Sequence, residues 1–266
     1  CKHPNVCRVL YSFASRVQLY VVLELCDCGD LLRLIDECST GFALEETRAY
    51  MTDVLSAVAH VHSHGIVHRD IKPANILRHA IVGRLFWCLK LADFGLAAAC
   101  PRGSSLPGHG TVPYMPTEQL LGFCNEACDI WACGCILFEF LLREMLVPES
   151  YWCENQAARD FQRSTEFDVR MGQAVLCYGR DAEASVLLRR LLALEWSLRP
   201  LAEEALRFLY ETDRFAENTM VAVLADPGVL GNAQPPPPFV PRAWCAYWAG
   251  DQSSWYFARG DAPGDS

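Results

Sequence analysis

The chain has 266 residues, 52% of them hydrophobic, which is enough to build one large domain or two small ones around a sizeable core. Its net charge of −9 argues against nucleic acid as a main partner, because binding to phosphate backbones requires a basic surface. The most apolar run, residues 130–142, is short and contains Glu139, so it predicts a buried helix and no membrane partner.

The fourteen cysteines follow no disulfide-framework spacing, and the N-terminus shows no charged-then-apolar leader. We therefore expect an intracellular protein, cytoplasmic or nuclear. Cys124, Cys128, Cys133 and Cys135 lie close together, so a zinc site must be weighed. They lack paired C-x-x-C spacing and lie mostly in or beside the apolar run, which favours core packing.

Two strands and two helices are predicted before residue 66. Residues 9–11 and the β-branched, apolar residues 17–25 are typical of strands. A short helix is expected over 31–38. A longer one is expected over 44–64, where apolar side chains recur with a period of 3.6 residues, and Gly65 is placed to end it. Three histidines near the end of this helix are interpreted as solvated: His60, His62 and His64.

The most informative stretch is HRDIKPAN at residues 68–75, where a carboxylate, a lysine two residues on and an amide five residues on share one loop. A second carboxylate follows in KLADFG at residues 90–95. Between them, residues 78–84 are interpreted as an extended turn leading into a strand over 86–91. Carboxylate and amide oxygens suit Mg²⁺, which prefers hard oxygen ligands and retains several waters.

Residues 68–75 and 90–95 together resemble the catalytic loop and DFG motif of the eukaryotic protein kinases. PTE at 116–118 stands where that family has Ala-Pro-Glu, and DIWACG at 129–134 matches the start of its central helix. The resemblance covers roughly residues 3–215. The string EQLLG at 118–122, with GCIL at 134–137, leans towards the cyclin-dependent and mitogen-activated branch.

The resemblance implies an α+β, protein-kinase-like fold with a truncated small β lobe and a mainly α-helical large lobe. Residues 1–26 would be a remnant of the small lobe (its fourth and fifth strands). Residues 27–218 would form the large lobe, and 219–266 a tail rich in Pro and Trp. The family places a glycine-rich loop, a strand-three Lys and a helix-C Glu before His3, so we expect the sequence to be N-terminally incomplete.

The resemblance also implies a reaction, the transfer of the γ-phosphate of ATP to a serine or threonine of a protein substrate. Asp70 would orient the acceptor hydroxyl, and Lys72 would hold the γ-phosphate. Asn75 and Asp93 would bind Mg²⁺, with Asn75 also counted among the catalytic residues. The motifs are completed by His68, Phe94 and Gly95.

A nucleotide site is implied at the hinge between the two lobes. Leu23 would lie at the back of the pocket, and the backbone of Glu24 and Cys26 would hydrogen-bond adenine. Asp30 would reach a ribose or a substrate, and Leu77 would pack beneath the adenine.

Further residues have supporting roles by the same resemblance. Thr111 would contact the catalytic Asp and Lys, and Asp129 would accept hydrogen bonds from the catalytic-loop backbone. Glu118 would pair with a buried Arg199. Residues 93–118 resemble the activation segment of the family, and Arg69 would receive a phosphate from this segment. The candidate acceptors for that phosphate are Ser104 and Ser105.

Other interpretations stay open at this point. The chain is alternatively a non-catalytic, kinase-like binding module or an inactive fragment, or else a small-molecule phosphotransferase. A regulatory subunit is an expected type of partner. The proline run at 235–238 suits an SH3- or WW-type groove, although a stiff linker is favoured.

Overall fold

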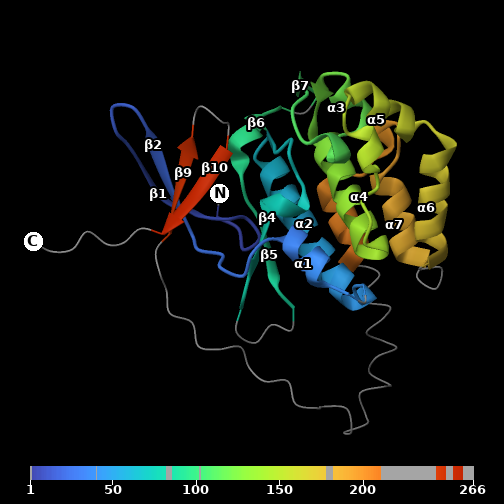
Figure 1. Cartoon of the computed structure of the whole chain (residues 1–266), viewed down its shortest axis with the longest axis horizontal. Coiled ribbons are helices and arrows are strands. Elements are labelled where there is room, and N and C mark those ends of the chain that lie inside the picture. Colours follow the sequence, from blue (N-terminus) through green and yellow to red (C-terminus); the bar gives the residue numbers. More distant parts are fainter. Residues whose placement is uncertain are drawn as a thin grey trace, which may run out of the picture.

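The computed structural model describes residues 2–39, 41–81, 86–101, 103–177 and 182–210, and the backbone of two strands further on. The strands of the largest sheet gather on one side of the molecule and the helices on the other (Figure 1). This division agrees with the predicted α+β fold of a small β part and a mainly helical part. The proline run at 235–238 and residues 82–84 of the extended turn lie outside the described residues.

The β part is a four-stranded antiparallel sheet in the order β1-β2-β9-β10. Its strands are β1 (Val9–Ala14), β2 (Leu19–Leu23), β9 (Trp244–Ala249) and β10 (Ser254–Arg259). The first two correspond to the strands predicted over 9–11 and 17–25. The last two come from the far end of the chain, and β9 pairs with β2 where Val21 faces Ala246 (Figure 1).

The helical part is built around α4 (Glu126–Leu142), which is buried almost all round. This explains why its sequence is mostly apolar and has no polar face, with Asp129 and Glu139 as buried exceptions. The side chain of Asn125 caps its first turn by accepting from the backbone N–H of Ala127 at 2.9 Å. α2 (Leu44–Ser63) packs against α4 and buries one stripe of apolar residues: Tyr50, Val54, Leu55, Val58 and Val61.

Shorter elements complete the helical part. Figure 1 shows α4 between the α2 side and the group formed by α5, α6 and α7. The helices are α1 (Leu31–Glu37), α3 (Thr117–Leu120), α5 (Asn155–Gln162), α6 (Thr165–Cys177) and α7 (Ala182–Leu191), followed by helical residues 202–210. Among the described residues, none of these helices combines the length and the apolarity that crossing a membrane requires.

Three small antiparallel pairs of strands position the loops. β3 (Ile66–Val67) pairs with β6 (Ala98–Ala99), and β7 (Leu106–Pro107) pairs with β8 (Phe123–Cys124). The longer pair is β4 (Ile76–His79) with β5 (Cys88–Leu91). β3 follows α2 directly because Gly65 adopts a left-handed φ of 66°, which ends the helix as predicted.

The N-terminal segment is joined to β5 before it enters the sheet. The backbone of Leu91 donates to Asn5 O at 2.8 Å and accepts from Cys7 N at 2.8 Å. The buried Asn5 side chain donates to Leu89 O at 3.0 Å, and Val6 forms a parallel bridge with Leu91. Hydrogen bonds therefore fasten residues 5–7 to β5, the strand that leads into Asp93.

The clustered cysteines pack in the core, as favoured from the sequence. Cys133 and Cys135 belong to the main hydrophobic core, while Cys124 and Cys128 form a smaller buried cluster with Val67 and Cys100. Among the described residues, no group of three or more metal-ligating side chains has a geometry that could hold a metal ion.

Candidate active site

The loop between β3 and the short 3-10 helix η1 (Pro73–Asn75) carries the residues of the HRDIKPAN motif. Asp129, in the first turns of α4, anchors this loop. Its Oδ2 accepts the backbone N–H of His68 at 2.8 Å, and its Oδ1 accepts that of Arg69 at 2.9 Å. These two bonds hold Arg69 at a left-handed φ of 70°, a conformation that a non-glycine residue rarely adopts.

His62 supports the same carboxylate, so its interpretation as a solvated helix-end histidine is wrong. Its Nε2 lies 2.8 Å from Asp129 Oδ2, and its side chain is only 8% exposed. Burial alone would raise the pKa of Asp129, but the hydrogen bond from His62 and the positive potential of His62 and His68 outweigh burial. The pKa of Asp129 is therefore lowered from its ordinary value, and the carboxylate stays ionised where it holds the loop.

Three side chains converge around the carboxylate of Asp70. Its Oδ1 accepts the hydroxyl of Thr111 at 2.6 Å, and its Oδ2 lies 2.9 Å from Lys72 Nζ. Lys72 Nζ also donates to Thr111 Oγ1 at 2.8 Å. Asn75 Nδ2 donates to Asp70 Oδ2 at 3.0 Å and to Asp70 O at 2.8 Å. Both bonds of Asn75 use its nitrogen, so neither occupies Oδ1, the atom that a metal ion would need.

Asp93 lies next to this loop through contacts of its neighbour Ala92. The N–H of Ala92 donates to Asn75 O at 2.9 Å, and Ala92 O lies 3.0 Å from His68 Nε2. Asp93 itself is exposed and has a left-handed φ of 57°, and it accepts the N–H of Gly95 at 3.2 Å. The two predicted metal ligands, Asn75 and Asp93, therefore stand on segments that are joined by one backbone hydrogen bond and by the His68 side chain.

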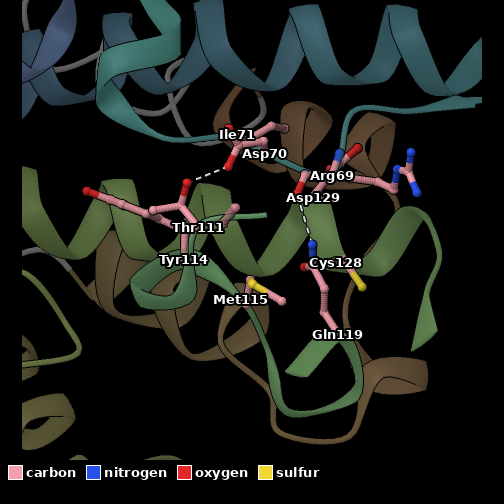
Figure 2. A pocket seen from close by; sticks show the side chains of 10 residues that line it. Arg69, Asp70, Ile71, Thr111, Tyr114, Met115, Gln119, Cys128 and Asp129 are labelled. Carbon is pink, nitrogen blue, oxygen red and sulfur yellow. Dashed lines mark hydrogen bonds between the residues drawn. The ribbon is translucent and has the colours of Figure 1, made fainter. Parts of the chain in front are cut away.

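Figure 2 shows how the segment after Asp93 lies against the catalytic loop, with Thr111 pointing to Asp70 and Gln119 pointing to the Arg69 backbone. The guanidinium of Arg69, which was predicted to receive a phosphate, donates to Leu96 O at 2.6 Å and to Pro107 O at 3.1 Å. It thus holds the segment at two backbone carbonyls. The predicted phosphate acceptors, Ser104 and Ser105, are exposed.

Glu118 and Arg199 meet as the sequence suggested. Arg199 donates to both carboxylate oxygens of Glu118, with a distance of 3.2 Å from Nη2 to Oε2. The Arg199 side chain is fully buried, and its Nε and Nη1 also donate to Ala193 O at 2.8 Å and Ala127 O at 3.0 Å. The guanidinium lies over the ring of Trp131 at 5.0 Å. The pair fixes the end of the segment to the base of α4.

The predicted hinge residues lie around β4 and β5. Glu24 receives the backbone N–H of Arg8 at 2.8 Å and lies 3.1 Å from Lys90 Nζ. Leu77 pairs with Lys90 across β4 and β5. The thiol of Cys26 hydrogen-bonds that of Cys7, and this contact and burial raise the pKa of Cys26.

Asp30 has a function that the sequence analysis did not assign to it. Its carboxylate caps α1 by accepting the backbone N–H of Arg33 at 2.8 Å. Its backbone forms a bridge with Leu77, so Asp30 lies at the predicted nucleotide side with one oxygen engaged by the helix. The expected contacts of these residues with adenine and ribose stay predictions.

A carboxylate, a lysine and an amide on one loop, with a second carboxylate on the next loop and a helical body behind them, are the arrangement typical of protein kinases. The family described as protein kinase domain matches residues 1–210. The chain belongs to this family.

Two plant proteins are among its relatives. It is 38% identical over 143 residues to "CBL-interacting protein kinase 9" of Oryza sativa subsp. japonica, covering 52% of this chain and 30% of that protein. It is 36% identical over 143 residues to "CBL-interacting serine/threonine-protein kinase 9" of Arabidopsis thaliana, covering 52% of this chain and 31% of that protein. The matched part thus spans under a third of each relative. These relatives give no support to the lean towards the cyclin-dependent and mitogen-activated branch.

Proposed function

We propose that this chain carries the catalytic machinery of a serine/threonine protein kinase, which transfers the γ-phosphate of ATP to a protein hydroxyl. The observation that carries this proposal is the network of Asp70, Lys72, Asn75 and Thr111. A non-catalytic binding module built on this fold has no need of the contacts that Lys72, Asn75 and Thr111 all make with Asp70. The anchoring of the loop by Asp129 and the buried Glu118–Arg199 pair speak against a small-molecule phosphotransferase.

Each residue of the network has a chemical task. Asp70 accepts the hydrogen bond of the substrate hydroxyl and takes up its proton as transfer proceeds. Lys72 lies 2.9 Å from that carboxylate. Its positive charge would stabilise the γ-phosphoryl group as it passes from the leaving ADP oxygen to the substrate hydroxyl oxygen. Thr111 bonds both groups and keeps the lysine and the carboxylate in register. Catalysis by this set is positioning together with electrostatic stabilisation.

The residues present also fit a magnesium ion. Asp93 offers an exposed carboxylate, and Asn75 offers its amide oxygen from a loop tied to Ala92. These are hard oxygen ligands in small number, which suits an ion that also binds waters and substrate phosphates. A bound Mg²⁺ would neutralise the charge of the phosphates, and Asp93 and Asn75 would hold it.

The test compares two variants that make the same change of charge. Asp70→Asn should lower phosphate transfer from Mg-ATP to serine- and threonine-containing peptides by about 10²–10⁴-fold, the contribution of a positioned acid or base. Asp168→Asn, at an exposed position of α6, should leave transfer unchanged. Full activity of Asp70→Asn, or transfer by the wild type to aminoglycosides or choline in preference to peptides, would contradict the proposal.

The metal assignment is tested by titration. Asp93→Asn should abolish Mg²⁺-dependent ATP binding by the full chain in calorimetry, because one of the two proposed ligands loses its charge. Unchanged binding would contradict the assignment.

Regulation by a partner belongs to the same proposal. The names of the two relatives state that they interact with CBL. For this chain we propose only that a protein subunit regulates it. We propose that it acts in the cytoplasm or the nucleus. Phosphorylation of Ser104 or Ser105, both exposed, would act through the segment that Arg69 holds.

A further inference from the structure

Gln119 connects the two chain segments that carry Asp70 and Thr111. It lies in α3, directly after Glu118, and its side chain is buried, with 3% of the residue exposed. Its Nε2 donates to Arg69 O at 2.9 Å and also to His109 O. Figure 2 shows this side chain rising from the lower segment to the catalytic loop.

Both acceptors stand close to reacting groups in sequence. Arg69 O belongs to the peptide bond that leads into Asp70, and His109 is two residues before Thr111. One amide group therefore fixes the backbone on either side of the 2.6 Å hydrogen bond between Thr111 and Asp70. The guanidinium of Arg69 holds the same segment further away, at Leu96 and Pro107.

The packing around this amide is close. Gly110 lies between the two segments with a φ of 150°, and a Cβ there would come within 2.6 Å of Arg69 O and 2.9 Å of Gln119 Nε2. The two segments can approach each other this closely because Gly110 has no Cβ and because Gln119 donates to a carbonyl of each segment. An apolar side chain of equal length would fill the space but would leave both carbonyl groups without this donor.

We propose that Gln119 is a positioning residue for phosphoryl transfer, which holds Thr111 and Lys72 in register with Asp70. The inference rests on the proposed kinase function. Gln119 would touch neither ATP nor the protein substrate. It would affect kcat only by positioning Asp70 and Thr111. A displacement of about 1 Å at a reacting group can cost 10²-fold in rate, so the loss of this amide should be visible in kcat.

The experiment uses Gln119→Met, which keeps the length and removes both donors, with Gln162→Met as the matched control. Gln162 is also a fully buried glutamine, and its Nε2 donates to one carbonyl of the same segment, Met115 O, at 2.8 Å. Its bonds do not reach the catalytic loop. Both variants should lose similar amounts of thermal stability, because each removes two hydrogen bonds of a buried glutamine side chain.

The two variants should differ in kinetics. Gln119→Met should lower kcat about 10²-fold with KM for ATP unchanged, while Gln162→Met should keep kcat within about threefold of the wild type. In Gln119→Met, the backbone amides of residues 109–111 should also exchange with deuterium faster. A wild-type kcat in a folded Gln119→Met, or an equal loss in both variants, would overturn the inference.

A second variant covers the case in which Gln119→Met does not fold. Gln119→Glu keeps the shape but sets a carboxylate against two carbonyl oxygens, and burial raises the pKa of such a group. Its protonated form regains one donor, so kcat relative to the wild type should rise as pH falls. A pH-independent ratio would contradict the proposal. Inactivity of the wild type on peptides would instead show that the kinase function itself is wrong.

Discussion

Replacing Glu139 with Gln should change how the stability of this protein depends on pH. Glu139 lies inside α4 with 2% of its surface exposed, and its Oε1 has no hydrogen-bond partner among the described residues. Burial, with a smaller contribution from the negative charge of Asp36, raises its pKa to about 8, although a hydrogen bond with Tyr114 acts to lower it. Cys135, one turn before it, is a buried thiol whose pKa is raised in turn.

The direction of this pH dependence follows from the pKa of Glu139 in the folded and the unfolded state. The pKa of the folded state, about 8, lies above the unfolded value of 4.5, so the folded chain binds this proton more tightly. The stabilisation is fully present below pH 4.5 and is lost as the pH rises towards 8. A difference of about 3.5 pKa units at 1.36 kcal/mol each gives roughly 5 kcal/mol over this range, and about 3 kcal/mol of it is lost by pH 7.

The assay is urea unfolding of wild type and Glu139→Gln at a series of pH values from 4.5 to 8.5. An amide cannot ionise, so the free energy of unfolding of the variant, relative to that of the wild type, should rise with pH by the amount above. Subtracting the two curves removes the contributions of all other titrating groups. A difference that stays constant across this range would refute the reasoning, because it would mean that Glu139 ionises in both states alike.

Three further predictions concern the packing around α4 and the end of the activation segment. Glu118→Gln should lower the free energy of unfolding by about 3–5 kcal/mol in chemical denaturation, because it leaves the buried charge of Arg199 unpaired; a loss below 1 kcal/mol would contradict this. Gly134→Ala should destabilise by about 1–3 kcal/mol, because its Cβ would come within 2.7 Å of Leu192; an unchanged melting temperature would show that the helices move apart freely. Gly172→Ala, where a Cβ meets nothing within 4 Å, should stabilise by up to about 1 kcal/mol in the same assay, and destabilisation would indicate a contact that the structure lacks.

The helices and motif loops were predictable because their sequences carry strong local constraints. The helix predicted over 44–64 is observed as Leu44–Ser63, since its apolar period is set by burial against α4. The run at 130–142 was recognised as a buried helix, but its start at Glu126 depends on a cap from Asn125 that apolarity does not reveal. Asp70 and Asn75 could be assigned to one loop because their spacing is short.

The contacts made across long stretches of sequence were not predictable in the same way. His62 binds a carboxylate 67 residues away, and Gln119 binds a backbone carbonyl 50 residues away. A lone polar side chain at a helix end has the same sequence signature whether it is solvated or buried. The contact of His62 depends on how α2 packs on α4, and that of Gln119 depends on how the activation segment packs on the catalytic loop. Neither packing can be read from the sequence. The tail strands β9 and β10 were also missed, because their pairing depends on the distant β2.

The hydrogen bonds that Asn5 and Cys7 make with Leu91 have a mechanical consequence for the proposed kinase. A rigid rotation of the whole N-terminal segment would break them, so the β1–β2 hairpin can swing only about a pivot that lies after Cys7. The strand that delivers Asp93 stays fixed during such a swing, held by Asn5 on one edge and by β4 on the other. In the proposed kinase, nucleotide would thus enter and leave beneath a moving hairpin, while Asp93, the proposed metal ligand, keeps its place.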